Sequence, residues 1–219
     1  YASGGEGASF NYVDYGQTVN PFGDPPFPAG TPLTAPTAEG GALRSQDLRT
    51  RADPLGLNGS IIRIDPETGL GVSANPLALD PEENARRMVG HGFRNPFRFA
   101  VRPGTNEVWV ADVGWNRADE IDVIPQGAAQ VLNFGWPCYE GGTPQEGFAG
   151  TFLNLCQDLY NAPGSVEFPY LFYQRGQAIV PGEACDPQGL TISGIAFYTG
   201  TKFPASYQDA LLFTDYARN

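Results

Sequence analysis

Basic residues are scarce in this sequence, and lysine is nearly absent. The 219 residues include 13 Lys and Arg against 24 Asp and Glu, which gives a formal net charge of −11, and Lys202 is the only lysine. Nucleic acids and anionic membrane surfaces both attract basic residues, so the composition argues against either partner. Acidic, lysine-poor sequences are also common in organisms with GC-rich genomes or high-salt habitats, so the charge does not indicate an acid-specific function.

Long apolar segments are missing as well. No run reaches the roughly 18 residues that a membrane span requires, so no span is predicted. Residues 1–6 lack the charged, apolar and cleavage regions of a signal peptide and are typical of the inside of a domain. Residues 211–216 are typical of a strand still in progress, so we expect a chain that is cut at both ends.

Charged residues are fewer than usual, and glycine and proline are abundant. The chain has 28 Gly, 20 Pro and 17% charged residues, where about a quarter is usual for the charged fraction. This composition argues against long helices and coiled coils. Apolar residues make up 41% and aromatic residues 12%, which excludes global disorder, and the length fits one domain or a large piece of one.

The cysteines are few and do not form a metal-binding pattern. Cys138, Cys156 and Cys185 include no C-x-x-C pair, and His91 is the only histidine, so a zinc site is not expected. Their Gly- and Pro-rich surroundings suit an oxidised, secreted protein with one disulfide and one odd thiol. Three pairings are possible. We favour Cys138 with Cys156 because the loop between them closes easily, although a partner of any cysteine can lie outside this sequence.

Two stretches lack the periodicity of regular structure. The proline-rich residues 20–28 cannot form a strand ladder, because proline lacks the backbone donor. We therefore predict long loop insertions over about 10–57 and 138–190 within a single domain, 1–219. One short helix is expected over 82–88, where an Asp-Pro pair supplies the N-cap and the first-turn proline.

Strands are predicted where short runs of β-branched and aromatic residues lie between turns. These runs are 61–65, 97–101, 107–112, 120–124, 194–198 and 210–214. The class is therefore all-β, and short strands at this spacing suit a sandwich or a β-propeller. Since a propeller blade takes about 40 to 50 residues, a propeller of this length would hold about three four-stranded antiparallel blades of an incomplete ring.

Two turns carry residues suited to ligand binding. Arg94 precedes a predicted strand, where a turn would hold its guanidinium for paired hydrogen bonds to a carboxylate. The alternative is that Arg94 pairs with a structural aspartate. In the turn 112–120, Gly114 would let backbone carbonyls approach a hard cation, which prefers oxygen ligands. The alternative there is an ordinary hairpin turn with a solvated acidic rim.

Taken together, these segments resemble the glucose/sorbosone dehydrogenase family, whose members are six-bladed propellers. The segments that carry the resemblance are Gly92-x-Arg94-Asn95-Pro96, residues 107–114 (EVWVADVG), Asp119-Glu120-Ile121 and residues 133–137 (NFGWP). Residues 1–7 (YASGGEG) and 59–64 (GSIIRI) are similar to strands of the same family. The resemblance spans most of the chain and is most specific between residues 90 and 137.

This resemblance implies an activity and its cofactors. The family oxidises an aldose at C1 to the lactone, transfers a hydride to pyrroloquinoline quinone (PQQ) and passes the electrons to an external acceptor. Arg94 and Asn95 match the residues that contact the quinone, whose carboxylates a guanidinium complements. The calcium ion beside the quinone is held by two consecutive backbone carbonyls, which match Gly114 and Trp115, although many members have Gly-Pro at these positions.

Other positions depart from the family. Thr199 lies where the family has a lysine that contacts the quinone, and Arg218 lies near a quinone-binding arginine and is expected to compensate. The catalytic histidine of the family lies upstream of the segment that matches Tyr1, so this chain starts too late to contain it. We expect His91 to be a packed structural residue. The chain alone is therefore expected to be inactive unless the remainder of the propeller completes the ring.

Two other functions remain open. The first is a non-catalytic extracellular propeller that binds carbohydrate or a protein partner, which the cysteine-bearing loops and the lost lysine favour. The second is a lactone hydrolase, which would need carboxylates that converge on one metal ion. Asp112, Asp119 and Glu120 are the candidates for that set.

Overall fold

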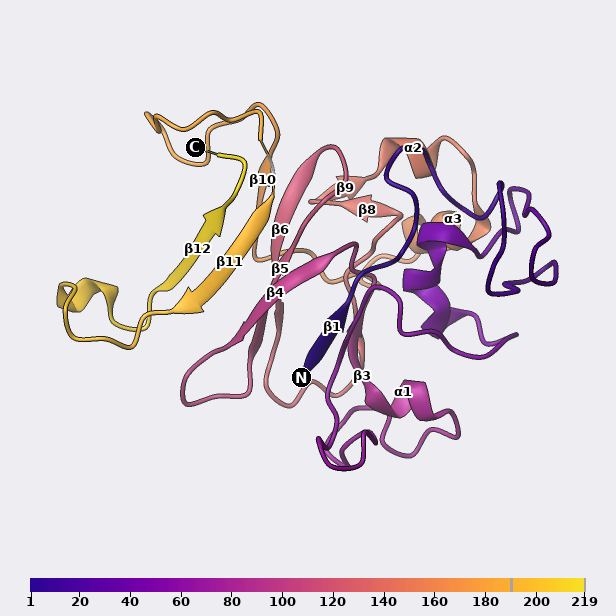
Figure 1. Cartoon of the computed structure of the whole chain (residues 1–219), viewed down its shortest axis with the longest axis horizontal. Helices are drawn as coiled ribbons and strands as arrows, with labels where there is room; N and C mark the ends of the chain where they lie inside the picture. Colours follow the sequence, from indigo (N-terminus) through magenta and orange to yellow (C-terminus); the bar gives the residue numbers. More distant parts are fainter. Residues whose placement is uncertain (190, 219) are drawn as a thin grey trace.

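The strands of the computed structural model, which describes residues 1–189 and 191–218, form four separate sheets (Figure 1). The first sheet has the order β1 (Ala2–Gly4), β2 (Ser60–Ile62), β3 (Met88–His91), β7 (Leu132–Asn133). The second has the order β10 (Leu171–Gln174), β6 (Ala118–Ile124), β5 (Val108–Asp112), β4 (Pro96–Val101). The two remaining sheets pair β11 (Ile192–Phe197) with β12 (Leu211–Asp215), and β8 (Tyr139–Glu140) with β9 (Thr143–Pro144).

The all-β prediction is confirmed, and the six predicted strands appear with boundaries shifted by a few residues. The meander β4–β5–β6 is antiparallel, with Ala100 opposite Trp109 and Val110 opposite Asp122. The expectation of purely antiparallel sheets is wrong at one edge, because β3 and β7 pair in parallel. The chain enters β7 from β6, which belongs to the second sheet. No local hairpin therefore sets the direction of β7 relative to β3.

The second sheet, β10-β6-β5-β4, is called the central sheet here. Its side chains alternate along each strand and give it two buried faces. On one face Val108, Val110 and Ile124 pack against Ile61 of β2 and Phe93, which follows β3. The opposite face carries Trp109, Ala111 and Ile121, which pack toward the β11–β12 pair through Ile192 and Phe197. Since successive residues of a strand point to opposite faces, the central sheet lies between two neighbouring sheets.

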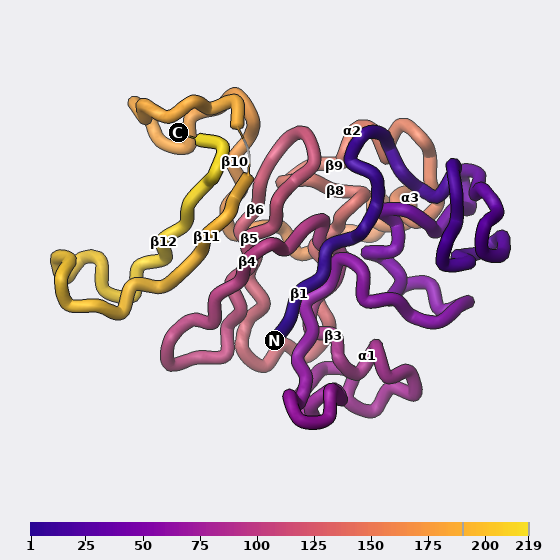
Figure 2. Tube along the Cα trace, viewed as in Figure 1, coloured from indigo at the N-terminus to yellow at the C-terminus, as the bar shows by residue number. Residues whose placement is uncertain are grey.

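The chain contains more helices than the one that the sequence predicts. The predicted helix is present as α1 (Glu83–Arg87). The other helices in the described residues are η1 (Gly41–Arg49), α2 (Glu146–Ala149), α3 (Asn154–Tyr160) and η2 (Ala205–Tyr207). The segments 10–57 and 138–190 are therefore not simple loops. Residues 10–49 and about 138–166 lie side by side, at the end of the molecule away from β11 and β12 (Figure 2), and share one core that includes Leu43, Phe148 and Leu153. The second segment then continues into β10 and a loop beside β12, where Glu183 pairs with Arg218.

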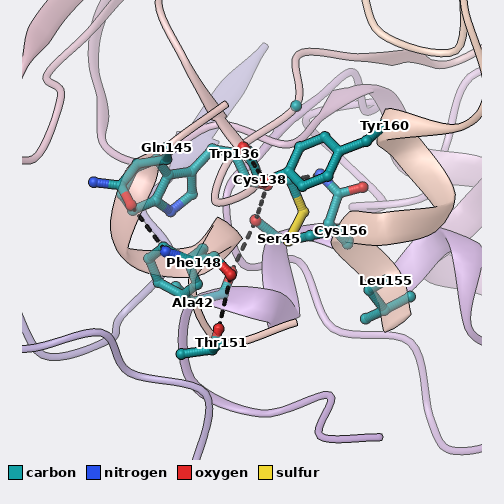
Figure 3. The surroundings of a disulfide bond; sticks show 12 residues. Ala42, Ser45, Trp136, Cys138, Gln145, Phe148, Thr151, Leu155, Cys156 and Tyr160 are labelled. Atoms are coloured by element: carbon teal, nitrogen blue, oxygen red, sulfur yellow. Dashed lines mark hydrogen bonds between the residues drawn. A yellow bond between two sulfur atoms is a disulfide. The ribbon is translucent and has the colours of Figure 1, made fainter. Parts of the chain in front are cut away.

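A disulfide links Cys138 and Cys156, as predicted, and anchors this shared core (Figure 3). Both cysteines are fully buried, and the Tyr160 hydroxyl donates a hydrogen bond to the carbonyl oxygen of Cys138 at 2.7 Å. Trp136 packs in the same cluster. Cys185 is a free, exposed thiol. No helix in the described part of the chain is long and apolar enough to cross a membrane.

We expect the double substitution Cys138→Ser, Cys156→Ser to lower the free energy of unfolding by about 3 kcal/mol, because a loop of this size loses its cross-link in the unfolded state. The two cysteines are 18 residues apart in the sequence. Urea unfolding followed by tryptophan fluorescence measures the change. Cys185→Ser is the matched control and should leave the midpoint unchanged; equal midpoints for all three proteins would contradict the prediction.

Candidate functional site

Arg94 and Asn95 occupy a tight turn between β3 and β4. Gly92, which precedes them, has φ 78°, and a side chain there would collide with Asn133, so glycine is required at this position. The backbone N–H groups of Arg94 and Asn95 donate to the two carboxylate oxygens of Asp112 at 2.9 and 2.6 Å. Asp112 therefore fixes the turn against the end of β5.

The Arg94 side chain points to the neighbouring turn after β5. Its Nη1 donates to the carbonyl oxygens of Val113 and Gly114 at 2.9 and 2.6 Å. The guanidinium carbon lies 5.7 Å from the centre of the Trp136 ring, and Nε lies 3.8 Å from Oε1 of Glu6. Within residues 1–189 and 191–218, Nη2 has no hydrogen-bond partner. The structure thus brings Arg94 and Gly114 together and leaves one edge of the guanidinium for a ligand.

Four backbone N–H groups of the turn that contains Gly114 and Trp115 converge on one carboxylate oxygen. Glu140 Oε1 accepts the backbone N–H groups of residues 115–118 at 2.7, 3.1, 3.1 and 3.2 Å. A side chain at Gly114 would collide with the carbonyl of Ala118. Trp115 uses the N–H that a proline would lack, so the departure from Gly-Pro contributes a hydrogen bond to the turn.

Two predicted site residues lie elsewhere. Thr199 is exposed after β11. Arg218 is buried, where Nη1 contacts Glu183 at 2.7 Å and Nη2 donates to the Gln177 carbonyl at 2.9 Å. Neither residue contacts Arg94 or Asn95 in the described part of the chain. Arg218 therefore cross-links the chain around β10 in this structure.

His91 is packed inside the first sheet. It is 4% exposed, and its Nδ1 lies 3.1 Å from the carbonyl oxygen of Ser45. Burial lowers the pKa of His91 from 6.5 to about 4, so the ring is neutral near pH 7. These features are typical of a structural histidine, as expected.

The three acidic candidates do not converge as a set. Asp119 lies on the opposite face of β6 from Glu120, where its carboxylate accepts the Gly114 N–H at 3.0 Å. Asp112 and Glu120 instead meet Asp122, and one ligand oxygen from each lies within 4.8 Å of the others. Asp122 was missed by the sequence reasoning, although its position two residues after Glu120 on a predicted strand places both on one face. We call Asp112, Glu120 and Asp122 the buried acidic triad.

Two members of the buried acidic triad, Glu120 and Asp122, have no cationic partner among the described residues, whereas Arg94 lies close enough to Asp112 to lower its pKa. The three side chains are 4%, 7% and 0% exposed in chain order, and neither oxygen of Asp122 has a hydrogen-bond partner in the described residues. Burial, together with the neighbouring carboxylates, raises the pKa of Glu120 and Asp122 well above their ordinary values. Buried carboxyl groups of this kind are stable when protonated or when a cation neutralises them.

We expect the cation-free protein to lose stability as the pH rises from about 5 to 8. Burial raises the pKa of Glu6, Asp47 and Asp112 to about 7, from ordinary values of 4.5, 3.8 and 3.8. At a pH between the ordinary pKa and the raised pKa of such a carboxyl group, the folded state holds a proton that the unfolded state has released. A rising pH therefore favours unfolding. Thermal midpoints in chelator at pH 5, 6, 7 and 8 test this; midpoints that rise across the series would contradict it.

Comparison with known proteins identifies relatives of this chain. A profile of the family described as Glucose / Sorbosone dehydrogenase matches residues 44–215. Aldose sugar dehydrogenase YliI of Escherichia coli (strain K12) is 28% identical over 165 residues, which cover 74% of this chain and 38% of that protein. The chain therefore spans well under half the length of this curated relative.

Two solved structures resemble the described fold. The soluble aldose sugar dehydrogenase of Escherichia coli, in its apo form, aligns with a TM-score of 0.51 and 25% identity over 76% of this chain and 41% of that chain. A glucose dehydrogenase aligns with a TM-score of 0.54 and 23% identity over 80% of this chain and 41% of that chain. The second likeness concerns the fold alone.

Proposed function

The chain belongs to the glucose/sorbosone dehydrogenase family, and on that premise we propose that it provides part of the quinone-binding centre of a PQQ-dependent aldose dehydrogenase. The substrate is an aldose, which is oxidised at C1 to the lactone, and the electrons pass to an external acceptor. Because the chain spans 38% of the length of YliI, the activity of the whole relatives is a proposal for this chain.

The sheets are proposed to be blades of a six-bladed propeller. The two four-stranded sheets and the β11–β12 pair would form about three blades of one domain over residues 1–219, with the remaining blades as a partner. The two buried faces of the central sheet support this arrangement, since each faces a neighbouring sheet, as the stacked sheets of a propeller do.

The observation that carries the proposed function is the geometry of Arg94. Its Nη1 is fixed on the carbonyls of Val113 and Gly114, while the Nη2 edge is left for an anion. PQQ is a tricarboxylate, and the two N–H groups of Nη2 can donate charge-assisted hydrogen bonds to its oxygens. Asn95 follows directly in the sequence, and its half-buried side-chain amide lies next to Gly5.

When bound, the quinone would supply a two-electron oxidant for the hydride of sugar C1, and a base would be needed for the hydroxyl proton. Arg94 binds and orients the ligand in this proposal. His91 does not act as the base, because it is buried and its Nδ1 faces the carbonyl of Ser45.

Calcium fits the buried acidic triad better than the carbonyls of Gly114 and Trp115. The Gly114 oxygen accepts Arg94 Nη1 at 2.6 Å, and a divalent cation about 4 Å from a guanidinium would be repelled by about 8 kcal/mol at an effective dielectric of about 20. The carbonyl pair, as it is arranged, therefore does not fit the ion. The triad offers side-chain oxygens, the ligands that calcium prefers, and we propose that it holds a structural calcium.

Secretion is proposed from the disulfide. The bond between Cys138 and Cys156 is buried in the core that positions Trp136, and such bonds form and persist in oxidising compartments. A protein that folds around this bond is suited to an extracellular location.

Absorbance titration of the protein with PQQ in the presence of calcium tests the proposed function. Saturable uptake, followed by dye reduction when aldoses are added, is the expected result. An absence of uptake would refute the quinone-dependent enzyme. It would favour the non-catalytic propeller that binds carbohydrate or a protein partner.

A further inference from the structure

Glu6 is a buried carboxylate that the proposed function leaves without a role. It follows β1 and is 6% exposed. Its backbone N–H donates to the Arg94 carbonyl at 2.9 Å, and its own carbonyl accepts Asn58 Nδ2 at 2.8 Å. These backbone contacts hold Glu6 beside Arg94 without help from its side chain.

The Glu6 carboxylate lies against the Nε edge of the Arg94 guanidinium. Its Oε2 accepts the indole N–H of Trp136, and its Oε1 is 3.8 Å from Arg94 Nε. In the described part of the chain Arg94 Nε is buried and has no hydrogen-bond partner. The guanidinium thus already has one anion on its Nε edge, while its Nη2 edge is open.

We propose that Glu6 is the internal counter-anion of Arg94 and takes up a proton when an anionic ligand binds to the open edge of this guanidinium. The ligand class is a carboxylate, such as those of the quinone, so the inference rests on the proposed function and deepens it. The reason is electrostatic. Two carboxylates on one half-buried guanidinium repel each other through a medium that water screens only in part, and protonation of Glu6 removes that repulsion.

The groups around Glu6 give its carboxyl a pKa that can be measured near neutral pH. Burial raises the pKa of Glu6 to about 7, the Trp136 hydrogen bond and Arg94 lower it, and the carboxylates of Asp112 and Asp14 raise it. Arg44 approaches the same loop, with Nη2 3.4 Å from the carbonyl of Gly7. A ligand carboxylate on Arg94 adds another negative charge, so it shifts the pKa of Glu6 upward. Ordinary ligand carboxylates, with a pKa near 4, stay ionised throughout this range.

Binding and proton uptake are therefore coupled. Where Glu6 is ionised in the free protein and protonated in the complex, each binding event takes up one proton. Affinity then weakens by up to about tenfold for each pH unit above 7. Below that pH, Glu6 is already protonated and the affinity is independent of pH.

The test is calorimetric titration at pH 6, 7 and 8 in phosphate and in Tris, whose different ionisation heats report the protons taken up. Two anions are titrated: PQQ, and oxalate as a dicarboxylate without a quinone. The proteins are the parent, Glu6→Gln, whose amide oxygen still accepts the Trp136 N–H, and Glu67→Gln, a control at an exposed carboxylate.

We expect the parent and the Glu67→Gln control to take up close to one proton at pH 8 and to bind more weakly there than at pH 6. Glu6→Gln should take up none, bind independently of pH and bind more tightly than the parent at pH 8. Equal proton uptake in Glu6→Gln and the parent would overturn the inference, and so would a failure of both anions to bind. Binding of oxalate with proton uptake that depends on Glu6, without binding of PQQ, would refute the proposed function alone.

A second measurement covers the case in which Glu6→Gln does not fold. Carbon-13 NMR of the Glu6 carboxyl in the parent protein gives its pKa directly, with and without oxalate. An upward shift on oxalate addition is expected. An unchanged or lowered pKa would overturn the inference.

Discussion

Replacing Arg94 with alanine is expected to weaken PQQ binding by roughly a hundredfold or more. The substitution removes the guanidinium whose open Nη2 edge faces the ligand, and one charge-assisted hydrogen bond contributes about 1.5 to 3 kcal/mol, so two lost together account for that factor. Arg94→Lys should lose roughly tenfold, because an ammonium keeps the charge but lacks the fixed, planar donors that bind the two carbonyls and the ligand at once. Absorbance titration with PQQ measures both effects.

The control for this prediction is Arg102→Ala. Arg102 is an exposed arginine that pairs with Glu107 at 3.3 Å across the β4–β5 hairpin, and its loss should leave quinone binding unchanged. Circular dichroism confirms that each variant is folded. Binding of PQQ to Arg94→Ala within threefold of the parent would show that the guanidinium does not hold the quinone.

The sheets could be predicted because their sequence pattern is local. In β5, residues at alternate positions enter two different cores, and the turns between β4, β5 and β6 are short, so the strands pair with their neighbours in sequence. The β3–β7 pairing has no such cue, since β7 contributes two residues at the end of a long connection. Its parallel direction depends on tertiary packing.

The helices of the long segments were missed for a different reason. Helices α2 and α3 have four and seven residues, which is too short to show a helical period, and the glycines and prolines around them are typical of loops. Their stability comes from burial of residues such as Phe148 and Leu153 against η1. Such contacts between distant segments cannot be found from local pattern.

In the candidate site, too, the local contacts could be predicted and the long-range contacts could not. Arg94 and Gly114 are 20 residues apart and joined by one hairpin, so their contact follows from adjacent turns. Glu6 and Trp136 are 130 residues apart, and Glu140 supports a turn more than 20 residues before it. These long-range partners depend on how segments that are distant in the sequence pack together.

Asp122→Asn is expected to have opposite effects on stability with and without calcium at pH 8. In chelator the variant should be more stable than the parent by about 1 to 3 kcal/mol, because it removes a buried carboxylate that has no hydrogen-bond partner among the described residues. In calcium the parent should gain about 4.1 kcal/mol when the ion is at about 1,000 times its dissociation constant, which exceeds the advantage of the variant in chelator. The variant should gain far less, since it has lost one of three anionic ligands.

Thermal and urea unfolding in chelator and in millimolar calcium measure whether the order of stability of parent and variant reverses. Asp158→Asn, at an exposed carboxylate, is the control. A purely structural carboxyl cluster that stays protonated would give no response to calcium in the parent, and that result would refute the structural calcium. The crossing itself separates ion binding from packing, because asparagine has nearly the volume of aspartate. A packing defect would lower stability under both conditions, whereas loss of a cation ligand changes the sign of the difference between them.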